Sequence, residues 1–313
     1  MKFLKKLFYR IVFNIKFFKK KQKKLINVDN YADLITINPA TNSASADIPK
    51  IIWLYWEGNM PELVEKCMQH IKALHRDYEV HILNPGNVQN FCSFDLNQII
   101  IKNATPQQRA DLIRLNLIYE FGGIWLDAST LVYEKLDWIN TLVKIHHCQC
   151  FSYYRAKNTT KINYPVVENW LIASVPKNLF YKYWFDGLIK AIEIGPKLYI
   201  KNLRKQTNHA EIFQEIGRPE YLIAYIVCQQ VMREYKASMV LINCDKNAFL
   251  YQVKNEWIKE KIAITLAIDQ APNLGPYLIK LAGKERKILS HIFLKKRYLY
   301  DSLLANFKNS MVN

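Results

Sequence analysis

The stretch Thr105–Ser129, TPQQRADLIRLNLIYEFGGIWLDAS, decides the fold class of this 313-residue chain. Its first four residues combine an N-cap threonine, a proline at the first helical position and a capping-box glutamine, so we predict a helix that runs to about Phe121. The glycine pair Gly122-Gly123 ends that helix with a tight turn. A short apolar run follows and ends at Asp127, which predicts a buried strand with a carboxylate at its carboxyl end.

The alternation of helix and strand continues on both sides of this stretch. The apolar run Ile51–Trp56 (IIWLYW) predicts a buried strand, Pro61–Leu74 a helix and Tyr78–Leu83 a second strand, which together open a βαβ unit. Further along, the pattern predicts strands at 150–154, 169–173 and 239–242 and helices at 179–192 and 219–235. We therefore predict an α/β fold with a mostly parallel sheet flanked by helices.

Asp111, Arg114 and Asp127 are the candidate functional residues of this stretch. Asp111 and Arg114 are three residues apart on a helix and share one face, and the carboxyl end of a strand is where α/β sheets place ligand sites. A carboxylate at that position can bind a divalent cation, which can in turn bind a diphosphate. The alternatives are a simple ion pair for Asp111 and Arg114, a helix C-cap for the glycines and a turn acceptor for Asp127.

Taken together, RADLIR (109–114) and YEFGGIWLD (119–127) resemble the donor-binding segment of bacterial capsular polysaccharide synthesis proteins. These are related to glycosyltransferase family 32, with its signature RAD-x-x-R…GG-I-Y-x-D-x-D, and more distantly to the large clostridial toxin glucosyltransferases. IIWLYW and ENWLIAS (168–174) resemble further, weaker parts of the pattern, so the resemblance spans roughly residues 47–285. It implies a GT-A fold and transfer of a sugar from a nucleotide-sugar donor, UDP-linked, to a growing, lipid-linked surface glycan.

The resemblance also implies roles for single residues. Trp53 would stack on the donor base, although an aromatic of the core strand is an equally good interpretation. Asp111 would bind hydroxyl groups of the donor's ribose or sugar, and Arg114 would lie beside the sugar or phosphate. Asp127 would be the first carboxylate of the DxD motif and contact ribose and metal. Asn169 would face the donor sugar or the acceptor.

The second carboxylate of the DxD motif is missing, because the chain reads Asp127-Ala128-Ser129. A neutral hydroxyl is a weaker ligand than a carboxylate for Mg²⁺ or Mn²⁺. The sequence leaves three alternatives for the expected divalent cation. Ser129 ligates it weakly beside Asp127, a downstream carboxylate or histidine such as His291 assists, or lysine and arginine side chains replace it.

The net charge of +17 is concentrated at the two ends of the chain. Residues 1–24 contain ten Lys and Arg and no acid, residues 280–313 contain eight basic and two acidic residues, and the residues between are nearly neutral. As a helix, residues 1–24 place Leu4, Phe8, Ile11, Ile15 and Phe18 on one face and Lys2, Lys6, Lys16 and Lys20 largely on the other. This pattern is typical of a helix on an anionic membrane surface, with a solvated tail or a protein-docked helix as alternatives. The neutral centre and the absence of RNP, KH or zinc-finger patterns argue against nucleic acid.

We therefore predict a basic amphipathic helix at 1–25, a linker at 26–47 and a GT-A domain at 48–313. The basic end at 280–313 is interpreted either as a last helical layer or as a second membrane contact. The six cysteines form no CxxC pair and no zinc-ligand spacing with histidine, which favours free thiols in the cytoplasm.

The predicted function is that of a glycosyltransferase at the inner face of the cell membrane. The family 32 relatives retain the configuration of the transferred sugar, so we expect retention. Because Ser129 replaces a carboxylate, a catalytically inactive GT-A domain that serves as a membrane-associated scaffold is the alternative.

Overall fold

The computed structural model describes residues 2–40, 47–98 and 104–309. Its centre is a seven-stranded sheet with the order β1-β8-β6-β7-β4-β2-β3. Strands β2, β3, β4, β6 and β8 run in one direction, while β7 and the edge strand β1 run in the other. The predicted α/β class with a mostly parallel sheet is confirmed. The strand bounds are β1 Ile35–Ile37, β2 Ile51–Tyr55, β3 Glu79–Leu83, β4 Gly123–Leu126, β6 Cys150–Tyr154, β7 Val167–Ser174 and β8 Met239–Asn243.

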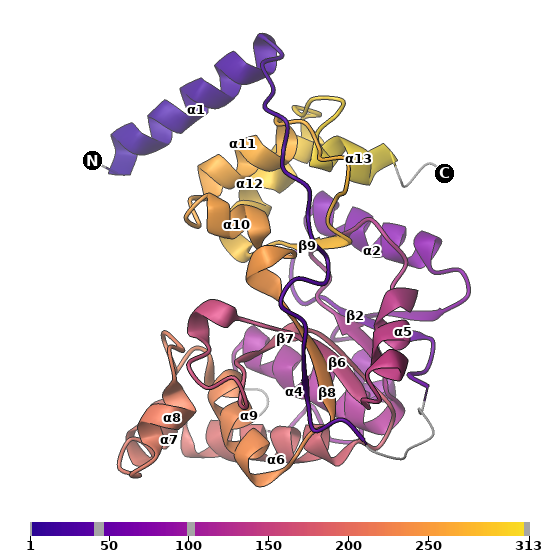
Figure 1. The fold of residues 1–313 in the computed structure, drawn as a ribbon, viewed down its shortest axis with the longest axis vertical. Helices are drawn as coiled ribbons and strands as arrows, with labels where there is room; N and C mark the ends of the chain where they lie inside the picture. Colours follow the sequence, from indigo (N-terminus) through magenta and orange to yellow (C-terminus); the bar gives the residue numbers. More distant parts are fainter. Residues whose placement is uncertain (1, 41–46, 99–103, 310–313) are drawn as a thin grey trace.

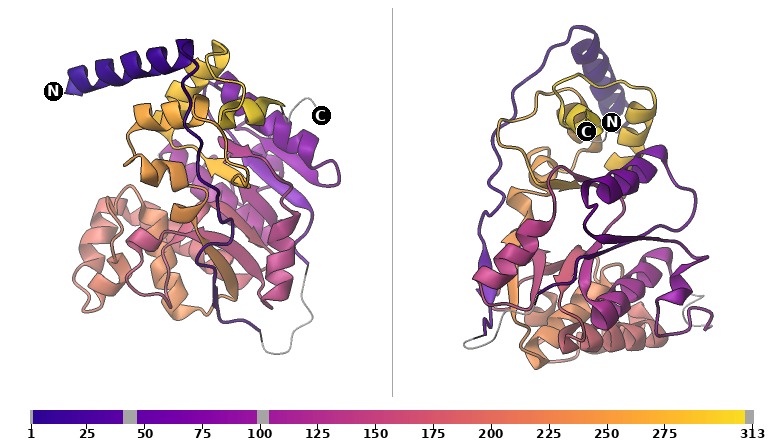
Figure 2. Two further views of the ribbon diagram at one scale, coloured as in Figure 1. Left: turned by 45° about the horizontal axis from the view of Figure 1, so that its top comes forward. Right: turned by 90° about the vertical axis from the view of Figure 1, so that its right-hand side faces the viewer.

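Helices cover both faces of this sheet (Figures 1 and 2). One face packs against α4 (Pro106–Phe121), α6 (Leu179–Ile194) and α9 (Ile223–Glu234), and the other against α2 (Glu62–Leu74) and α5 (Asp137–Ile145). Two smaller helices, α7 (Pro196–Leu203) and α8 (His209–Phe213), lie beside α6 and α9. The apolar runs of the central strands are buried because helices cover them on both sides.

A third layer closes the carboxyl end of the sheet (Figure 1). It has its own apolar cluster and contains α10 (Leu250–Lys254), α11 (Lys259–Ala267), α12 (Gly283–Leu294) and α13 (Leu303–Asn309). The basic C-terminal stretch is therefore a helical layer in the described residues, with Leu289, Leu304 and Phe307 fully buried. A two-stranded sheet of β5 (Thr130–Val132) and β9 (Leu278–Lys280) ties this layer to the end of β4.

The helix–glycine–strand unit forms as the sequence predicts. The hydroxyl of Thr105 accepts from the backbone N–H of Gln108, whose side chain accepts from the N–H of Thr105, so the capping box is complete. Gly122 and Gly123 have φ values of +67° and +86°. A Cβ on Gly123 would lie 2.6 Å from the carbonyl oxygen of Ile51, so both the backbone conformation and the close approach of β2 require glycine.

The segment 26–40 packs on the body of the protein. The prediction of a linker at 26–47 is therefore wrong for these residues. Residues 35–37 form β1, which pairs antiparallel with β8. Asn30 donates to the carbonyl of Gly275 and accepts from the N–H of Tyr277. These bonds satisfy backbone groups of the body, so the segment is held along its length (Figure 1). Residues 41–46 lie outside the described residues.

The N-terminal helix α1 (Lys2–Phe18) has two apolar faces. One face packs on α11 through Phe13, which is buried, while Lys16 forms an ion pair of 2.8 Å with Asp269. The opposite face is exposed and consists of Leu4, Leu7, Phe8, Ile11, Ile15 and Phe18. No helix in the described part of the chain has the length and apolar character needed to span a membrane.

Candidate active site

Asp127 lies at the carboxyl end of β4, and two cationic groups and an indole N–H meet at its side chain. Its backbone N–H donates to the carbonyl of Trp170 at 2.8 Å, which fixes it against the neighbouring strand β7. Its Oδ1 accepts from Arg114 Nη2 at 2.9 Å and from Trp125 Nε1 at 3.3 Å. Its Oδ2 lies 2.6 Å from the ammonium of Lys280. Burial by itself raises the pKa of Asp127, but Lys280 and Arg114 outweigh it and hold this pKa below its usual value.

Asp111 and Arg114 extend this group into the interior along α4. Arg114 Nη1 lies 2.9 Å from Asp111 Oδ1, and both side chains are almost fully buried. Burial raises the pKa of Asp111 to about 6, although Arg114 acts in the opposite direction. The guanidinium of Arg114 lies 5.1 Å from the ring centre of Trp125, and its buried Nε has no hydrogen-bond partner. Arg114 thus joins the two carboxylates and fixes their separation.

Asn169 joins the same group because β7 carries a bulge. The pairing of β6 with β7 shifts between Ser152 and Tyr153, and the hydroxyl of Ser152 donates to the carbonyls of Glu168 and Leu171. Bulges redirect side chains, and here Asn169 donates to Asp111 Oδ1 at 2.9 Å. The neighbouring Glu168 accepts from the hydroxyl of Tyr225 on α9 at 2.8 Å, and burial raises its pKa. The structure therefore brings Asp111, Arg114, Asp127 and Asn169 into one connected group, and Glu168 is the residue next to Asn169 on β7.

Two basic residues of the C-terminal stretch reach the same site, and the sequence did not single them out. Lys280 is the last residue of β9, which pairs with β5 opposite Thr130 and thus directs its side chain to Asp127. Arg286 on α12 donates from Nη1 to the hydroxyl of Ser129 at 3.4 Å. Both come from a stretch of alternating basic and apolar residues that has no recognisable motif. Only the pairing of β9 with β5, two strands of three residues each, brings them to Asp127.

Trp53 does not belong to this group. It is 1% exposed, its ring stacks on His81 with centroids 4.4 Å apart, and its Nε1 donates to the carbonyl of Gly122. Of its two interpretations, the core aromatic is the one that the structure supports, because no face of the ring is free to stack on a base. Trp56 is the partly exposed tryptophan at the carboxyl end of the same run, and the guanidinium of Arg286 lies 4.7 Å from its ring centre. Its place at the carboxyl end of a strand is the sequence feature that could have identified Trp56 as a site residue.

The residues proposed as metal ligands do not fit a divalent cation. Ser129 is 2% exposed, donates to the carbonyl of Leu281 and accepts from Arg286, so its oxygen has cationic rather than anionic neighbours. Both oxygens of Asp127 already accept from basic groups. His291 is exposed and lines a different pocket, between α1 and α12. The described residues hold no group of three or more His, Cys, Asp or Glu side chains with metal-binding geometry, and a hard cation requires several oxygen ligands.

A pocket of about 310 Å³ lies at the carboxyl ends of β2 and β3, beside the N-terminal half of α4. Its polar lining is Tyr55, Glu57, Asn97 and Arg109, of which Arg109 forms an ion pair with Glu57. Because α4 also carries Asp111 and Arg114, one helix connects this pocket to the charged group.

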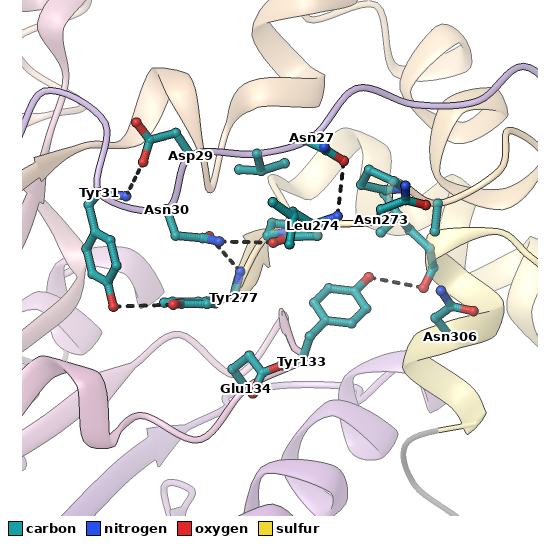
Figure 3. A pocket seen from close by; sticks show the side chains of 16 residues that line it. Asn27, Asp29, Asn30, Tyr31, Tyr133, Glu134, Asn273, Leu274, Tyr277 and Asn306 are labelled. Carbon is teal, nitrogen blue, oxygen red and sulfur yellow. Dashed lines mark hydrogen bonds between the residues drawn. The ribbon is translucent and has the colours of Figure 1, made fainter.

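A larger pocket of about 790 Å³ lies between the N-terminal segment and the segment before β9 (Figure 3). The hydroxyl groups of Tyr31 and Tyr277 point toward each other there, the side chain of Asn30 accepts from the backbone N–H of Tyr277, and the hydroxyl of Tyr133 donates to the carbonyl of Leu303. These hydrogen bonds hold together the segments that form the pocket. None of the residues around Asp127 lines it, so it is separate from the candidate active site.

The similar proteins of known name are all described as glycosyltransferases. Glycosyltransferase afumC of Aspergillus fumigatus is 27% identical over 134 residues, which are 38% of this chain and 33% of that protein. Inositol phosphoceramide mannosyltransferase 3 of Schizosaccharomyces pombe is 32% identical over 120 residues, or 34% of this chain and 33% of that protein. O-glycosyltransferase braB of Annulohypoxylon truncatum is 27% identical over 103 residues, or 28% and 24%. These relatives are fungal, and the alignments cover a third or less of each.

The solved structure of the PaToxG glycosyltransferase aligns with 99% of this chain and 97% of its own, at 12% identity and a TM-score of 0.38. The family described as capsular polysaccharide synthesis protein matches residues 6–193, a range that includes α4, β4 and the residues Asp111, Arg114, Asp127 and Asn169. Since this match covers more than half of the 313 residues, the chain belongs to the capsular polysaccharide synthesis protein family.

Proposed function

We propose that this protein is a GT-A glycosyltransferase that uses a nucleotide-sugar donor, UDP-linked. The observation that carries the proposal is the connected group of Asp111, Arg114, Asp127 and Asn169 at the carboxyl end of the sheet. Family membership and relatives named as glycosyltransferases support the same reaction class. The pocket between β2, β3 and α4 has the volume for a nucleoside, and although none of these four side chains lines it, it shares the helix α4 with Asp111 and Arg114.

The chemistry of the site suits departure of a diphosphate. When the bond between the sugar and the donor phosphate breaks, negative charge develops on the leaving diphosphate, and fixed cationic groups stabilise it. Arg114, Lys280 and Arg286 supply such groups within contact of Asp127 and Ser129. The carboxylate of Asp111 can accept hydrogen bonds from sugar hydroxyls, and the amide of Asn169 can donate to them. The resemblance to family 32 supports retention of configuration.

The acceptor part of the proposal is a lipid-linked surface glycan at the cytoplasmic face of the membrane. Its support is the exposed apolar face of α1, on which Leu4, Phe8 and Phe18 are 68%, 59% and 74% exposed. Because the opposite face of α1 is held by the body, the helix can lie on a membrane without leaving the protein.

Release of free nucleotide from UDP-, GDP- and CMP-sugars by the purified protein tests the proposal. We expect release from at least one donor and its loss in Asp127→Ala and Arg114→Ala. Asp186→Ala serves as the matched control, since Asp186 is an exposed carboxylate paired with Lys182 on α6. Turnover that survives both site substitutions would contradict the site assignment.

Two observations favour the alternative, a catalytically inactive GT-A domain that acts as a membrane-associated scaffold. Ser129 stands where the resemblance expects a carboxylate, and Lys280 covers Asp127. The alternative predicts no nucleotide release from any donor, with or without Mn²⁺, from a protein that still binds anionic vesicles.

A further inference from the structure

Lys280 and Arg286 occupy the two positions at which a divalent cation would be bound in the predicted motif. The ammonium of Lys280 lies 2.6 Å from Asp127 Oδ2, on the oxygen that does not accept from Arg114. Arg286 lies beside Ser129, the position of the missing carboxylate, with Nη1 at 3.4 Å from the hydroxyl. Positive charge is therefore supplied at this site by the chain itself.

The backbone holds these two side chains in place. Lys280 is opposite Thr130 in the β5–β9 pair, and the N–H of Leu281 donates to the carbonyl of Ser129 at 3.3 Å. Arg286 lies in the first turns of α12, three residues after its start, and stacks on Trp56. The strand pair and the ring thus position both cations without the aid of a ligand.

Arg286 has unused capacity to bind an anion. Asp127 and Glu285 are near enough to attract its charge, but neither forms an ion pair with it among the described residues, and its buried Nε has no hydrogen-bond partner. A guanidinium presents five N–H groups in a geometry that matches phosphate oxygens. Lys280 shares its carboxylate with Arg114, so Asp127 neutralises only part of the charge of this pair.

We propose that Lys280 and Arg286 replace the divalent cation and bind the diphosphate of the nucleotide-sugar donor directly, so that donor binding and sugar transfer require no metal. This inference rests on the proposed function. In the transfer, a bond forms between the acceptor oxygen and the anomeric carbon, and the bond from that carbon to the β-phosphate oxygen breaks. The electron pair of the broken bond remains on the diphosphate, which Lys280 and Arg286 stabilise, and the proton of the acceptor hydroxyl passes to the diphosphate.

A cation at Asp127 would compete with this arrangement. It would have to displace the ammonium of Lys280 from Oδ2 and would face repulsion from Arg114 and Arg286. The single carboxylate and the buried hydroxyl of Ser129 offer few oxygen ligands in return. The protein groups are already in place and gain a dianionic partner when the diphosphate binds.

Calorimetric titration of the full-length protein with UDP and GDP, in EDTA and in Mn²⁺, tests the inference. Uridine and guanosine serve as probes without phosphate. We expect one nucleotide to bind with the same affinity, within about twofold, in both conditions. Lys280→Gln and Arg286→Gln should each weaken its binding by about tenfold or more, as expected for the loss of a hydrogen bond between charged groups. Binding of the matching nucleoside should be unchanged.

Lys284→Gln is the matched control, because Lys284 is an exposed lysine at the start of the same helix α12. Lys280→Arg and Arg286→Lys should retain most of the affinity, which separates a charge requirement from a packing defect. Thermal unfolding of each variant shows whether it is folded, and Arg286→Gln leaves the pair of Lys280 with Asp127 intact.

The outcomes separate the two proposals. Binding that appears only in Mn²⁺, or affinity that is unchanged in both glutamine variants, overturns metal-free diphosphate binding but leaves a nucleotide-binding protein. Failure of both nucleotides to bind in either condition contradicts the proposed function, and this inference with it.

Discussion

The ammonium of Lys280 lies 2.6 Å from Oδ2 of Asp127 and joins the end of β9 to the end of β4. Arg114 approaches the other oxygen of the same carboxylate at 2.9 Å, so Asp127 is shared by one cation from each side. The side chain of Asp127 is 25% exposed, so it is accessible from solvent, as the proposed donor would require. This relationship connects the helical layer at the C-terminus to the site on the sheet.

Replacement of Asp127 by Asn should destabilise the protein, because it leaves Lys280 and Arg114 close together without their shared anion. We expect a loss of about 1–3 kcal/mol in the free energy of unfolding, measured in urea. Asp186→Asn, at the exposed pair with Lys182, should change it by less than about 1 kcal/mol. A double-mutant cycle of Asp127→Asn with Lys280→Met that shows no coupling would contradict the pairing.

Replacement of Asp111 by Asn should alter how stability depends on pH. Burial raises the pKa of Asp111 to about 6. From about pH 4 to about pH 6 the folded chain therefore holds a proton on this carboxyl that the unfolded chain has released, and stability falls as pH rises through this interval. Asn has no carboxyl proton to release. As pH rises from about 4 to about 6, the free energy of unfolding of the variant should therefore increase relative to that of the wild type, by up to about 3 kcal/mol. A difference that stays constant across this interval would refute the raised pKa.

Replacement of Gly123 by Ala should destabilise the sheet at the point where β4 begins. The φ of Gly123 is +86°, and a Cβ would lie 2.6 Å from the carbonyl oxygen of Ile51. Gly58 has the same φ with no atom near its Cβ position and is the matched control. We expect a loss of about 1 kcal/mol for Gly58→Ala and at least about 3 kcal/mol for Gly123→Ala in urea unfolding. Equal losses would show that the close contact with β2 contributes nothing.

The exposed face of α1 should bind anionic membranes. A variant with Phe8, Ile11 and Ile15 changed to Ser should bind vesicles of phosphatidylglycerol and phosphatidylcholine more than about tenfold less in sedimentation, because each side chain loses apolar area that the membrane would bury. Its thermal stability should be unchanged, since these side chains do not pack on the body.

Serine replacement of three apolar residues of the body, each at least 50% exposed, controls for a general loss of surface hydrophobicity. These residues are Ile145, Ile162 and Leu198. Binding of this control at the level of the wild type is expected. Equal binding of the α1 variant would show that α1 does not provide the membrane contact.

Much of the central fold could be predicted from local patterns. The helix of α4, its capping box, the glycine turn and the strands β2, β3, β4, β6, β7 and β8 all have apolar periodicity or turn residues in their own sequence. The strands β1, β5 and β9 have three residues each and were not predicted. Strands so short carry no periodic signal, and their partners are distant in the chain, so only the assembled sheet shows them.

The site could be predicted in part for the same reason. Asp111 and Arg114 are related by helical spacing and Asp127 by its place at a strand end, so their proximity follows from local structure. Glu168, Lys280 and Arg286 have no such local relation to Asp127, whereas Trp56 directly follows a strand as Asp127 does. The predicted linker shows the same limit, because the hydrogen bonds of Asn30 to Gly275 and Tyr277 depend on residues far along the chain.

By itself, the sequence determined the α/β class, the helix–glycine–strand unit and the candidate residues Asp111, Arg114 and Asp127. Each of these depends on periodicity or spacing within about twenty residues. The tertiary structure decided that Trp53 is in the core and that the basic C-terminal stretch contributes Lys280 to the candidate site as well as charge to the surface. The physical reason is the pairing of β5 with β9, which carries Lys280 to Asp127 and α12, with Arg286, to Ser129. Charge counted along the chain cannot show which charges meet in space.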